Sequence, residues 1–177
     1  MTFEEKTLSS EMIYSGRIIN LRKDKVTVVN GTSSREVVEH NGGAVLIAVT
    51  DEKKMVMVRQ YRKPAKKVMF EVPAGKIDPN EEPEVTAKRE LKEETGYTAG
   101  SVKYICKFYP SVGYSEEVLH LYFCSDLVKG DTAFDDNEAI DIEEYGIEEL
   151  FNMVMRGEID DAKTIIAIMY ARELTNR

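Results

Sequence analysis

The sequence "VPAGKIDPNEEPEVTAKRELKEETGY", Val72–Tyr97, passes from an apolar strand through a tight turn into a helix. Pro83 stands near the start of the helical pattern and acidic residues fill its first turn. Gly96 stands at the expected C-cap position. Proline at the start and glycine just past the end are typical helix boundaries, so this segment predicts a helix between Glu81 and Gly96.

The predicted helix gathers carboxylates on one face. At about 100° per residue, Glu90 and Glu94 share that face and Glu93 lies three positions after Glu90. Arg89 is four residues before Glu93 and can pair with it. A solvated acidic face is the ordinary interpretation, although like charges at this spacing cost roughly a few tenths of a kcal/mol each. The alternative is a site for Mg²⁺, which prefers oxygen ligands and can clamp a diphosphate and activate a water.

The spacing of the whole segment resembles the Nudix box without a departure. That pattern is Gly, five residues, Glu, seven residues, Arg-Glu-apolar, one residue, Glu-Glu, one residue, Gly-apolar. The fixed positions in this chain are Gly75, Glu81, Arg89, Glu90, Glu93, Glu94 and Gly96, with Leu91 and Tyr97 at the apolar positions. The resemblance implies that Glu81 braces the loop and that Gly75 and Gly96 serve backbone geometry.

The resemblance also implies a metal site. Glu90 and Glu94 would be the principal ligands. Glu93 would assist them, and the backbone carbonyl of Ala74 would complete the site. Arg89 would orient Glu93 rather than touch the substrate, and Arg89, Glu93 and Glu94 count among the catalytic residues. The implied cofactor is Mg²⁺, with Mn²⁺ as a substitute, present as two or three ions.

The flanking sequence is similar to the ADP-ribose pyrophosphatase branch of this family. The similar segments are "YSGRIINLRKDKV", "EHNGGAVLIAV", "VRQYRKPAKKVMFEVPAGKID", "FYPSVGYSEEVLHLYF" and "GEIDDAKTIIAI", which together cover nearly the whole chain. This implies that water attacks a phosphorus of ADP-ribose to give AMP and ribose 5-phosphate. One departure is Val112, in "SVG", where the branch often carries a proline.

Two alternatives remain open. Val112 keeps open a Nudix pyrophosphatase for another nucleoside diphosphate derivative, such as a nucleotide sugar or a dinucleotide. The remote alternative is a non-catalytic Nudix module that senses ADP-ribose. Such modules usually lose a box glutamate and carry a DNA-binding extension. This chain keeps every box carboxylate and shows no basic helix-turn-helix pattern.

Outside the box, the resemblance implies residues that bind substrate and activate water. Arg62 matches an arginine that contacts the phosphates or the terminal ribose, and a guanidinium fork suits phosphate oxygens. Arg35 falls where relatives place an adenine-stacking side chain, and Glu36 beside it can accept the adenine amino group. The general base is Glu117 or Glu138, which match loop glutamates credited with that role. For the two arginines, an exposed surface residue is the ordinary interpretation.

Runs of strands with few helices predict an α+β fold. The resemblance implies an α/β/α sandwich with a mixed sheet for residues 42–177, the Nudix hydrolase domain. Residues 1–41 predict a small antiparallel sheet with turns at Ser15-Gly16, Lys23-Asp24 and Asn30-Gly31. In the resembled branch such strands exchange between the subunits of a homodimer and complete the partner's adenosine pocket.

Further elements are expected after residue 42. The patterns predict strands at 44–50, 54–61, 102–110, 118–127 and 140–146, and helices at 147–157 and 160–174. Asp160 or Asp161 can cap the last helix.

Composition limits the class of partner. The chain has 177 residues, 42% of them hydrophobic, and a net charge of -8, which argues against a protein that grips nucleic acid or an anionic membrane. Cys106 and Cys124 predict buried thiols, and His40 and His120 predict histidines held within strands. The polar start is unlike a signal peptide and the longest apolar run is too short to span a bilayer, so we expect a cytoplasmic protein.

Overall fold

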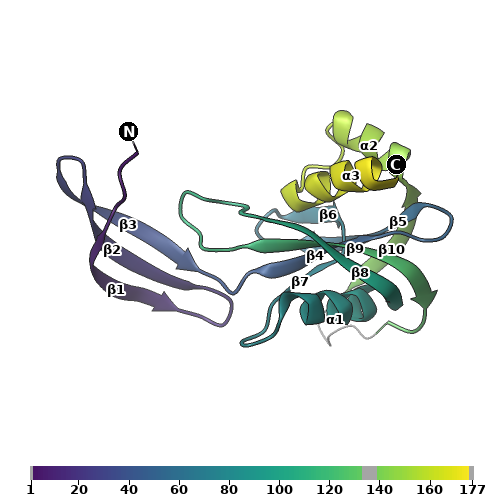
Figure 1. Cartoon of the computed structure of the whole chain (residues 1–177), viewed down its shortest axis with the longest axis horizontal. Helices are drawn as coiled ribbons and strands as arrows, with labels where there is room; N and C mark the ends of the chain where they lie inside the picture. Colours follow the sequence, from purple (N-terminus) through teal and green to yellow (C-terminus); the bar gives the residue numbers. More distant parts are fainter. Residues whose placement is uncertain (1, 133–138, 176–177) are drawn as a thin grey trace. The chain divides into compact units, whose positions relative to one another are not determined.

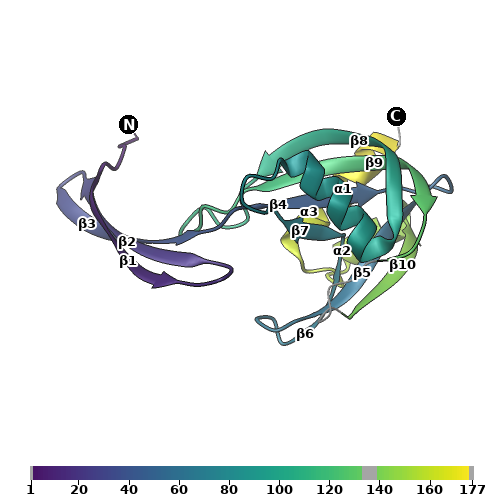
Figure 2. The same ribbon diagram turned by 90° about the horizontal axis from the view of Figure 1, so that it is seen from below.

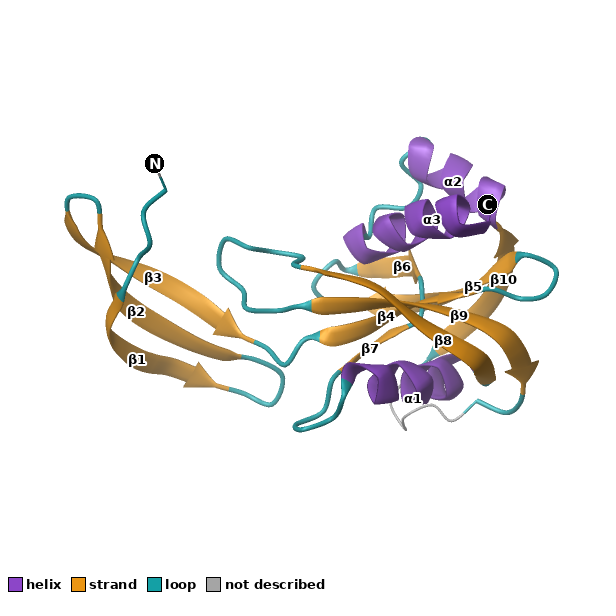
Figure 3. Cartoon of the chain, in the orientation of Figure 1, coloured by secondary structure: helices purple, strands orange, loops and turns teal. Residues whose placement is uncertain are grey.

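The computed structural model describes residues 2–132 and 139–175. Its chain forms two compact units, one of residues 1–42 with 109–118, the other of residues 43–108 with 119–177. Both helices and strands occur, which confirms the α+β class (Figure 3). Within the described residues, no helix has the length and apolar content needed to span a membrane.

The first unit contains an antiparallel sheet of strand order β1-β2-β3 (Figure 1). Its strands are β1 (Thr7–Ser15), β2 (Asn20–Val28) and β3 (Gly31–Glu39). The predicted turn between β2 and β3 is confirmed, because Gly31 adopts a φ of 109°, a conformation that favours glycine. The small N-terminal antiparallel sheet is therefore confirmed.

The turn predicted at Lys23-Asp24 is wrong, since β2 runs straight through both residues. Asp24 pairs with Ser10 of β1 on one side and with Arg35 of β3 on the other. The Asp24 carboxylate is buried and accepts the Nε–H of Arg22 at 3.1 and 3.2 Å. Lys23-Asp24 contains no glycine to favour a turn. Pairing with strands on both sides and the Arg22–Asp24 ion pair therefore stabilise the extended conformation over a turn.

The second unit contains the predicted mixed sheet, of strand order β7-β4-β9-β8. Its strands are β4 (Gly43–Ala48), β7 (Ala74–Lys76), β8 (Tyr97–Phe108) and β9 (Leu119–Lys129). Strand β4 is parallel to β9 and antiparallel to β7, and β8 is antiparallel to β9. A further sheet has the order β10-β5-β6, from β5 (Lys54–Arg62), β6 (Lys67–Glu71) and β10 (Ile140–Gly146).

Helix α1 (Pro83–Thr95) covers one face of the mixed sheet, and α2 (Ile147–Met155) and α3 (Ala162–Thr175) cover the other (Figures 1 and 2). Alternation along β4 explains both layers, because successive side chains of a strand point to opposite faces. Leu46 packs with Leu91 of α1, whereas Ile47 packs in the cluster that holds the inner residues of α2 and α3. The α/β/α sandwich is thus confirmed.

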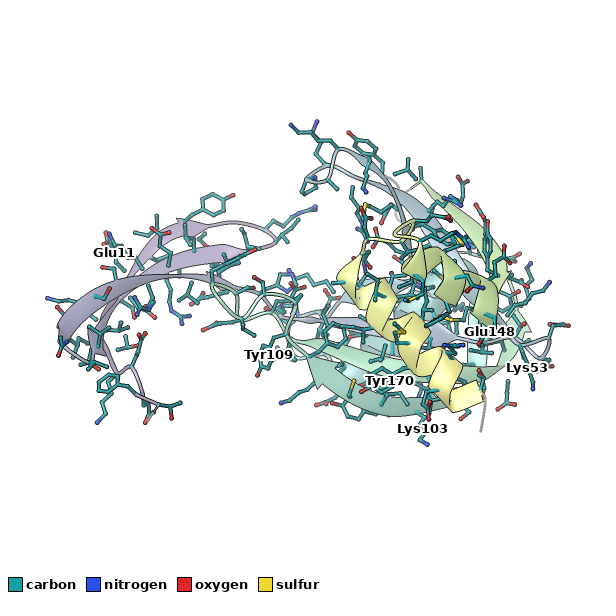
Figure 4. All side chains as sticks on the ribbon, turned by 90° about the horizontal axis from the view of Figure 1, so that it is seen from above. Glu11, Lys53, Lys103, Tyr109, Glu148 and Tyr170 are labelled. Atoms are coloured by element: carbon teal, nitrogen blue, oxygen red, sulfur yellow. The ribbon has the colours of Figure 1, made fainter. Side chains whose placement is uncertain are left out.

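The helix ends follow the sequence signals. Gly96 adopts a φ of 74° and donates its N–H to the Lys92 carbonyl, as a C-cap glycine should. Asp161 caps α3, since its Oδ2 accepts the Thr164 N–H at 3.0 Å. On the outer surface of the α2–α3 layer, Glu148 accepts the Arg172 Nε–H at 2.7 Å (Figure 4).

The burial expected of Cys106 and the strand position expected of His40 need correction. Cys124 is buried as predicted, but Cys106 is only half-buried. Cys106 lies on β8, where it packs at the edge of the core formed with α2 and α3, the helix that carries Tyr170 (labelled in Figure 4). His120 lies in β9 as expected, whereas His40 follows the end of β3 and accepts the Gly42 N–H at 3.0 Å.

Candidate active site

Arg89, in the middle of α1, connects the box carboxylates. Its Nη1 donates to Glu90 Oε1 at 2.7 Å and to Glu93 Oε2 at 2.9 Å. Its Nε and Nη2 donate to the two oxygens of Glu81 at 3.1 and 3.0 Å. One planar guanidinium therefore holds three carboxylates of the box, and the contact with Glu93 is the one expected of an orienting arginine.

The charged groups of this cluster shift one another's pKa values. The hydrogen bonds from Arg89, then from Thr86 and the Asp78 backbone, lower the pKa of Glu81 to about 2. The hydrogen bond to Glu81 is also the largest cause that raises the pKa of Arg89, although burial opposes it. The loop before α1 is thus fixed to the helix by an ion pair that persists in weak acid.

Glu81→Gln is expected to lower the free energy of unfolding by about 1–3 kcal/mol at neutral pH. The pKa of Glu81 is about 2 in the folded chain against an ordinary 4.5, so its ionised form stabilises the fold above pH 4.5. That contribution is lost as the pH falls from 4.5 towards 2. Urea unfolding of both proteins at pH 6 and pH 3 tests this: their difference should shrink by up to about 1.4 kcal/mol per pH unit. A pH-independent difference would contradict the assignment.

Gly75 leaves room for the Glu90 carboxylate. A Cβ at this position would lie 1.8 Å from Glu90 Cδ and 2.0 and 2.3 Å from its oxygens. Strand β7 brings Gly75 opposite Ala44 of β4, so the sheet edge and the Glu90 carboxylate are in direct contact. Among the described residues, Gly75 is not one of the glycines with positive φ. The box glycine is therefore required for space rather than for backbone conformation, which differs from the expectation.

Glu94 lies deeper, at 6% exposure, and joins the helix to the same strand. Its Oε2 accepts the Ala74 N–H at 3.0 Å. This contact places the Ala74 peptide directly beside Glu94. The predicted ligands Ala74, Glu90 and Glu94 thus meet where β7 passes α1.

The donor chemistry fits a hard divalent cation. Glu90, Glu93, Glu94 and the Ala74 carbonyl offer oxygen atoms alone, which suit Mg²⁺ and Mn²⁺. Across residues 2–132 and 139–175, no three His, Cys, Asp or Glu side chains converge in metal-binding geometry. Arg89 instead neutralises part of the cluster through Glu90 and Glu93.

Arg62, at the end of β5, lies in the same unit but faces a different carboxylate. Its Nε and Nη2 donate to the two oxygens of Glu71 at 2.8 and 3.0 Å. Glu71 is 2% exposed and also accepts a hydrogen bond from Lys163 of α3. Burial alone would raise the pKa of Glu71, but Arg62 and Lys163 hold it below its ordinary value. Sequence reasoning missed Lys163, because nothing in "DDAKT" indicates a partner on a distant strand.

The remaining predicted residues lie elsewhere. Arg35 and Glu36 are consecutive on β3, so they point to opposite faces of the N-terminal sheet. Arg35 donates to Glu5 Oε2 at 2.9 Å. Glu117 belongs to the loop of that same unit, with Oε1 3.7 Å from His40 Nδ1. Glu138 lies outside the described residues.

Known proteins are similar to this chain in sequence and in fold. The chain is 44% identical over 171 residues to the methanol dehydrogenase activator of Bacillus methanolicus, covering 95% of this chain and 92% of the relative. It is 42% identical to the ADP-ribose pyrophosphatase of Bacillus subtilis (strain 168), covering 96% and 93%. The fold matches a solved structure titled "Crystal structure of ADP compounds hydrolase", with a TM-score of 0.86, 19% identity and coverage of 99% and 96%.

Two family descriptions match along the chain. Residues 5–38 match the "Nucleoside diphosphate sugar hydrolase N-terminal domain". Residues 40–167 match the NUDIX domain, which includes the whole of the box, α1 and the mixed sheet. The resemblance predicted from the spacing of the box is confirmed, and the chain belongs to the NUDIX domain family.

Proposed function

We propose that this chain is a Nudix hydrolase that cleaves the diphosphate of ADP-ribose to AMP and ribose 5-phosphate, with water attacking phosphorus. The main observation in support is that the residues of the complete box lie together in the fold. Arg89 binds Glu90 and Glu93, and Gly75 leaves space for the Glu90 side chain. The identity of 42% with an ADP-ribose pyrophosphatase over nearly the full chain supports this substrate.

The cluster residues have separate roles in this proposal. Glu90 and Glu94 hold the divalent cations, assisted by Glu93 and the Ala74 carbonyl. The cations are Mg²⁺, or Mn²⁺ in its place, as two or three ions; when bound they polarise the diphosphate and favour ionisation of a water. Arg89 keeps the carboxylates oriented while the ions are absent, and the Ala74 N–H fixes the rotamer of Glu94.

The predicted residues outside the box recognise the substrate and activate water in this proposal. Arg62 binds the phosphates or the terminal ribose. Arg35 stacks on the adenine. Glu36, which was expected to accept the adenine amino group, lies on the opposite face of the N-terminal sheet, so the two side chains of one strand do not hold the same base. Glu117 or Glu138 takes the proton of the attacking water.

We further propose a homodimer in the cytoplasm, with the strands of residues 1–41 exchanged between subunits and residues 42–177 forming the hydrolase domain. In support, β1 is exposed along its whole length, and Met12, Ile13 and Tyr14 are each at least half exposed. A sheet with such apolar surface is typical of a subunit contact. Light scattering of the purified protein tests this, and a monomer at micromolar concentration would contradict it.

The function is tested directly by incubating the protein with Mg²⁺ and ADP-ribose and measuring AMP. AMP and ribose 5-phosphate should form in equal amounts, and excess EDTA should stop their formation. If no AMP formed at any pH from 7 to 9, the proposed activity would be wrong.

The second candidate is hydrolysis of another nucleoside diphosphate derivative, such as a nucleotide sugar or a dinucleotide. It is favoured by the match of residues 5–38 to a nucleoside diphosphate sugar hydrolase domain and by Val112 in the "SVG" turn. A substrate panel ranked by kcat/KM separates the two candidates. Because one relative is named a methanol dehydrogenase activator, the panel includes methanol dehydrogenase activity with and without this protein.

Gly75→Ala is expected to lower kcat by roughly tenfold with little loss of stability. The new methyl group would overlap the end of the Glu90 side chain, which is flexible and can move, so the fold survives while the carboxylate is displaced. Steady-state kinetics and thermal unfolding of the variant measure both effects. Gly146→Ala is the control, because a Cβ there meets nothing within 4 Å. Equal activity of the two variants would contradict the role assigned to Gly75.

A further inference from the structure

Glu71 is a buried carboxylate shared by two cations. Arg62 binds both of its oxygens, at 2.8 and 3.0 Å, and the Lys163 ammonium donates to Oε2. The exposures differ: Glu71 is 2% exposed and Lys163 is 14%, but Arg62 is 41%. Of the two cations, only Arg62 is therefore well placed to meet a ligand from solvent.

Lys163 is itself held firmly in the first turn of α3. Its Nζ donates to Asp161 Oδ2 at 2.9 Å, and the same oxygen accepts the Thr164 N–H and hydroxyl at 3.0 and 2.6 Å. Thr164 Oγ1 in turn accepts the Val72 N–H at 3.0 Å. The start of α3 is thus fastened to Val72, the residue that follows Glu71, and this keeps Lys163 beside the carboxylate.

The Arg62 guanidinium also interacts with carboxylates other than Glu71. The hydrogen bond to Glu71 is the largest cause that raises the pKa of Arg62; the charges of Glu94 and Asp161 add to it, and burial opposes it. Glu94 is the buried box glutamate that accepts the Ala74 N–H. Arg62 binds Glu71 and Glu94 binds the Ala74 N–H three residues further along the chain, so both side chains contact the same short segment between β6 and β7.

We propose that Lys163 is a positioning residue that acts through Glu71 to let Arg62 transfer its guanidinium from Glu71 to a substrate phosphate. This inference rests on the proposed function. Removing the cation from a buried carboxylate leaves the negative charge without a partner, which is strongly unfavourable. Because Lys163 remains on Glu71, the carboxylate stays paired when Arg62 leaves. Without Lys163, Arg62 becomes the cation that Glu71 must retain.

The first experiment compares kinetics on ADP-ribose with Mg²⁺. Lys163→Met should raise KM by about tenfold with kcat within about threefold of wild type, because it removes binding common to the ground and transition states. Lys163→Arg, which keeps the charge, should restore most of the affinity. Lys67→Met is the matched control: Lys67 pairs with Asp160 at the surface, and such exposed pairs contribute little.

A double-variant cycle shows whether Lys163 acts through Arg62. In an Arg62→Met background, Lys163→Met should change KM by less than about twofold, since the residue it positions is gone. A wild-type KM in Lys163→Met, or the full tenfold effect in the Arg62→Met background, would overturn the proposal.

A second measurement needs no substrate and so separates this inference from the proposed function. Proton exchange at Arg62 Nε, followed by NMR of the free protein, should slow several-fold in Lys163→Met because Arg62 is then held on Glu71. Lys163→Arg should match wild type. Unchanged or faster exchange in Lys163→Met overturns the inference, even if wild type hydrolyses ADP-ribose. Slower exchange in a protein that fails to hydrolyse ADP-ribose would support the coupling of Lys163 to Arg62 through Glu71 and would contradict the proposed substrate alone.

Discussion

Glu94→Gln is expected to lower kcat for ADP-ribose hydrolysis by at least about 100-fold, with the fold retained. The glutamine is isosteric and its carbonyl oxygen can still accept the Ala74 N–H, which Glu94 accepts at 3.0 Å. What it loses is the negative charge, at a position that is 6% exposed and four residues after Glu90 on the same helix face. A neutral amide cannot replace a carboxylate as a ligand that offsets the charge of a divalent cation.

The measurement is kcat at saturating Mg²⁺, together with Mg²⁺ affinity and thermal unfolding of both proteins. Glu84→Gln is the matched control, because Glu84 also lies on α1 but is exposed and pairs with Lys88 one turn further along the helix. Its activity should equal that of wild type. Near-normal turnover of Glu94→Gln would remove Glu94 from the catalytic set.

The box could be predicted from sequence because its information is local. Helix signals, from Pro83 to the left-handed Gly96, place Arg89 and the glutamates on a known face of α1 before any tertiary contact forms. The structure adds how that face is used: Arg89 reaches Glu90 and Glu93 in the helix and also Glu81 in the preceding loop. Local spacing predicted the contact with Glu93, and the resemblance predicted that Glu81 braces the loop. The contact with Glu90 was not predicted.

Contacts between distant segments were beyond sequence reasoning. Lys163 and Glu71 are separated by 92 positions, and only the packing of α3 on the β6–β7 connection brings them together. The overlap that a Cβ at Gly75 would create with Glu90 likewise depends on β7 lying against α1. The failed turn at Lys23-Asp24 has the same cause, because its extended backbone is fixed by strands on both sides rather than by its own residues.

Arg89→Lys is expected to lower both stability and activity although the charge is kept. The lysine ammonium is a point charge, whereas the guanidinium of Arg89 donates along separate directions to Glu81, Glu90 and Glu93. A single Nζ cannot reach all three carboxylates from one rotamer. We expect a loss of about 1–3 kcal/mol in the free energy of unfolding, as for other hydrogen bonds to charged groups.

The same substitution should lower kcat by about 10- to 100-fold, because residues that orient metal ligands typically have effects of this size. Extra Mg²⁺ should recover part of the activity, since bound cations relieve the repulsion among the carboxylates that Arg89 otherwise relieves. Arg156→Lys is the matched control, because Arg156 makes an exposed pair with Glu158 at 2.5 Å outside the cluster. If Arg89→Lys and Arg156→Lys were equally active, a point charge would suffice, and the orientation of Glu93 by a planar guanidinium would play no part in catalysis.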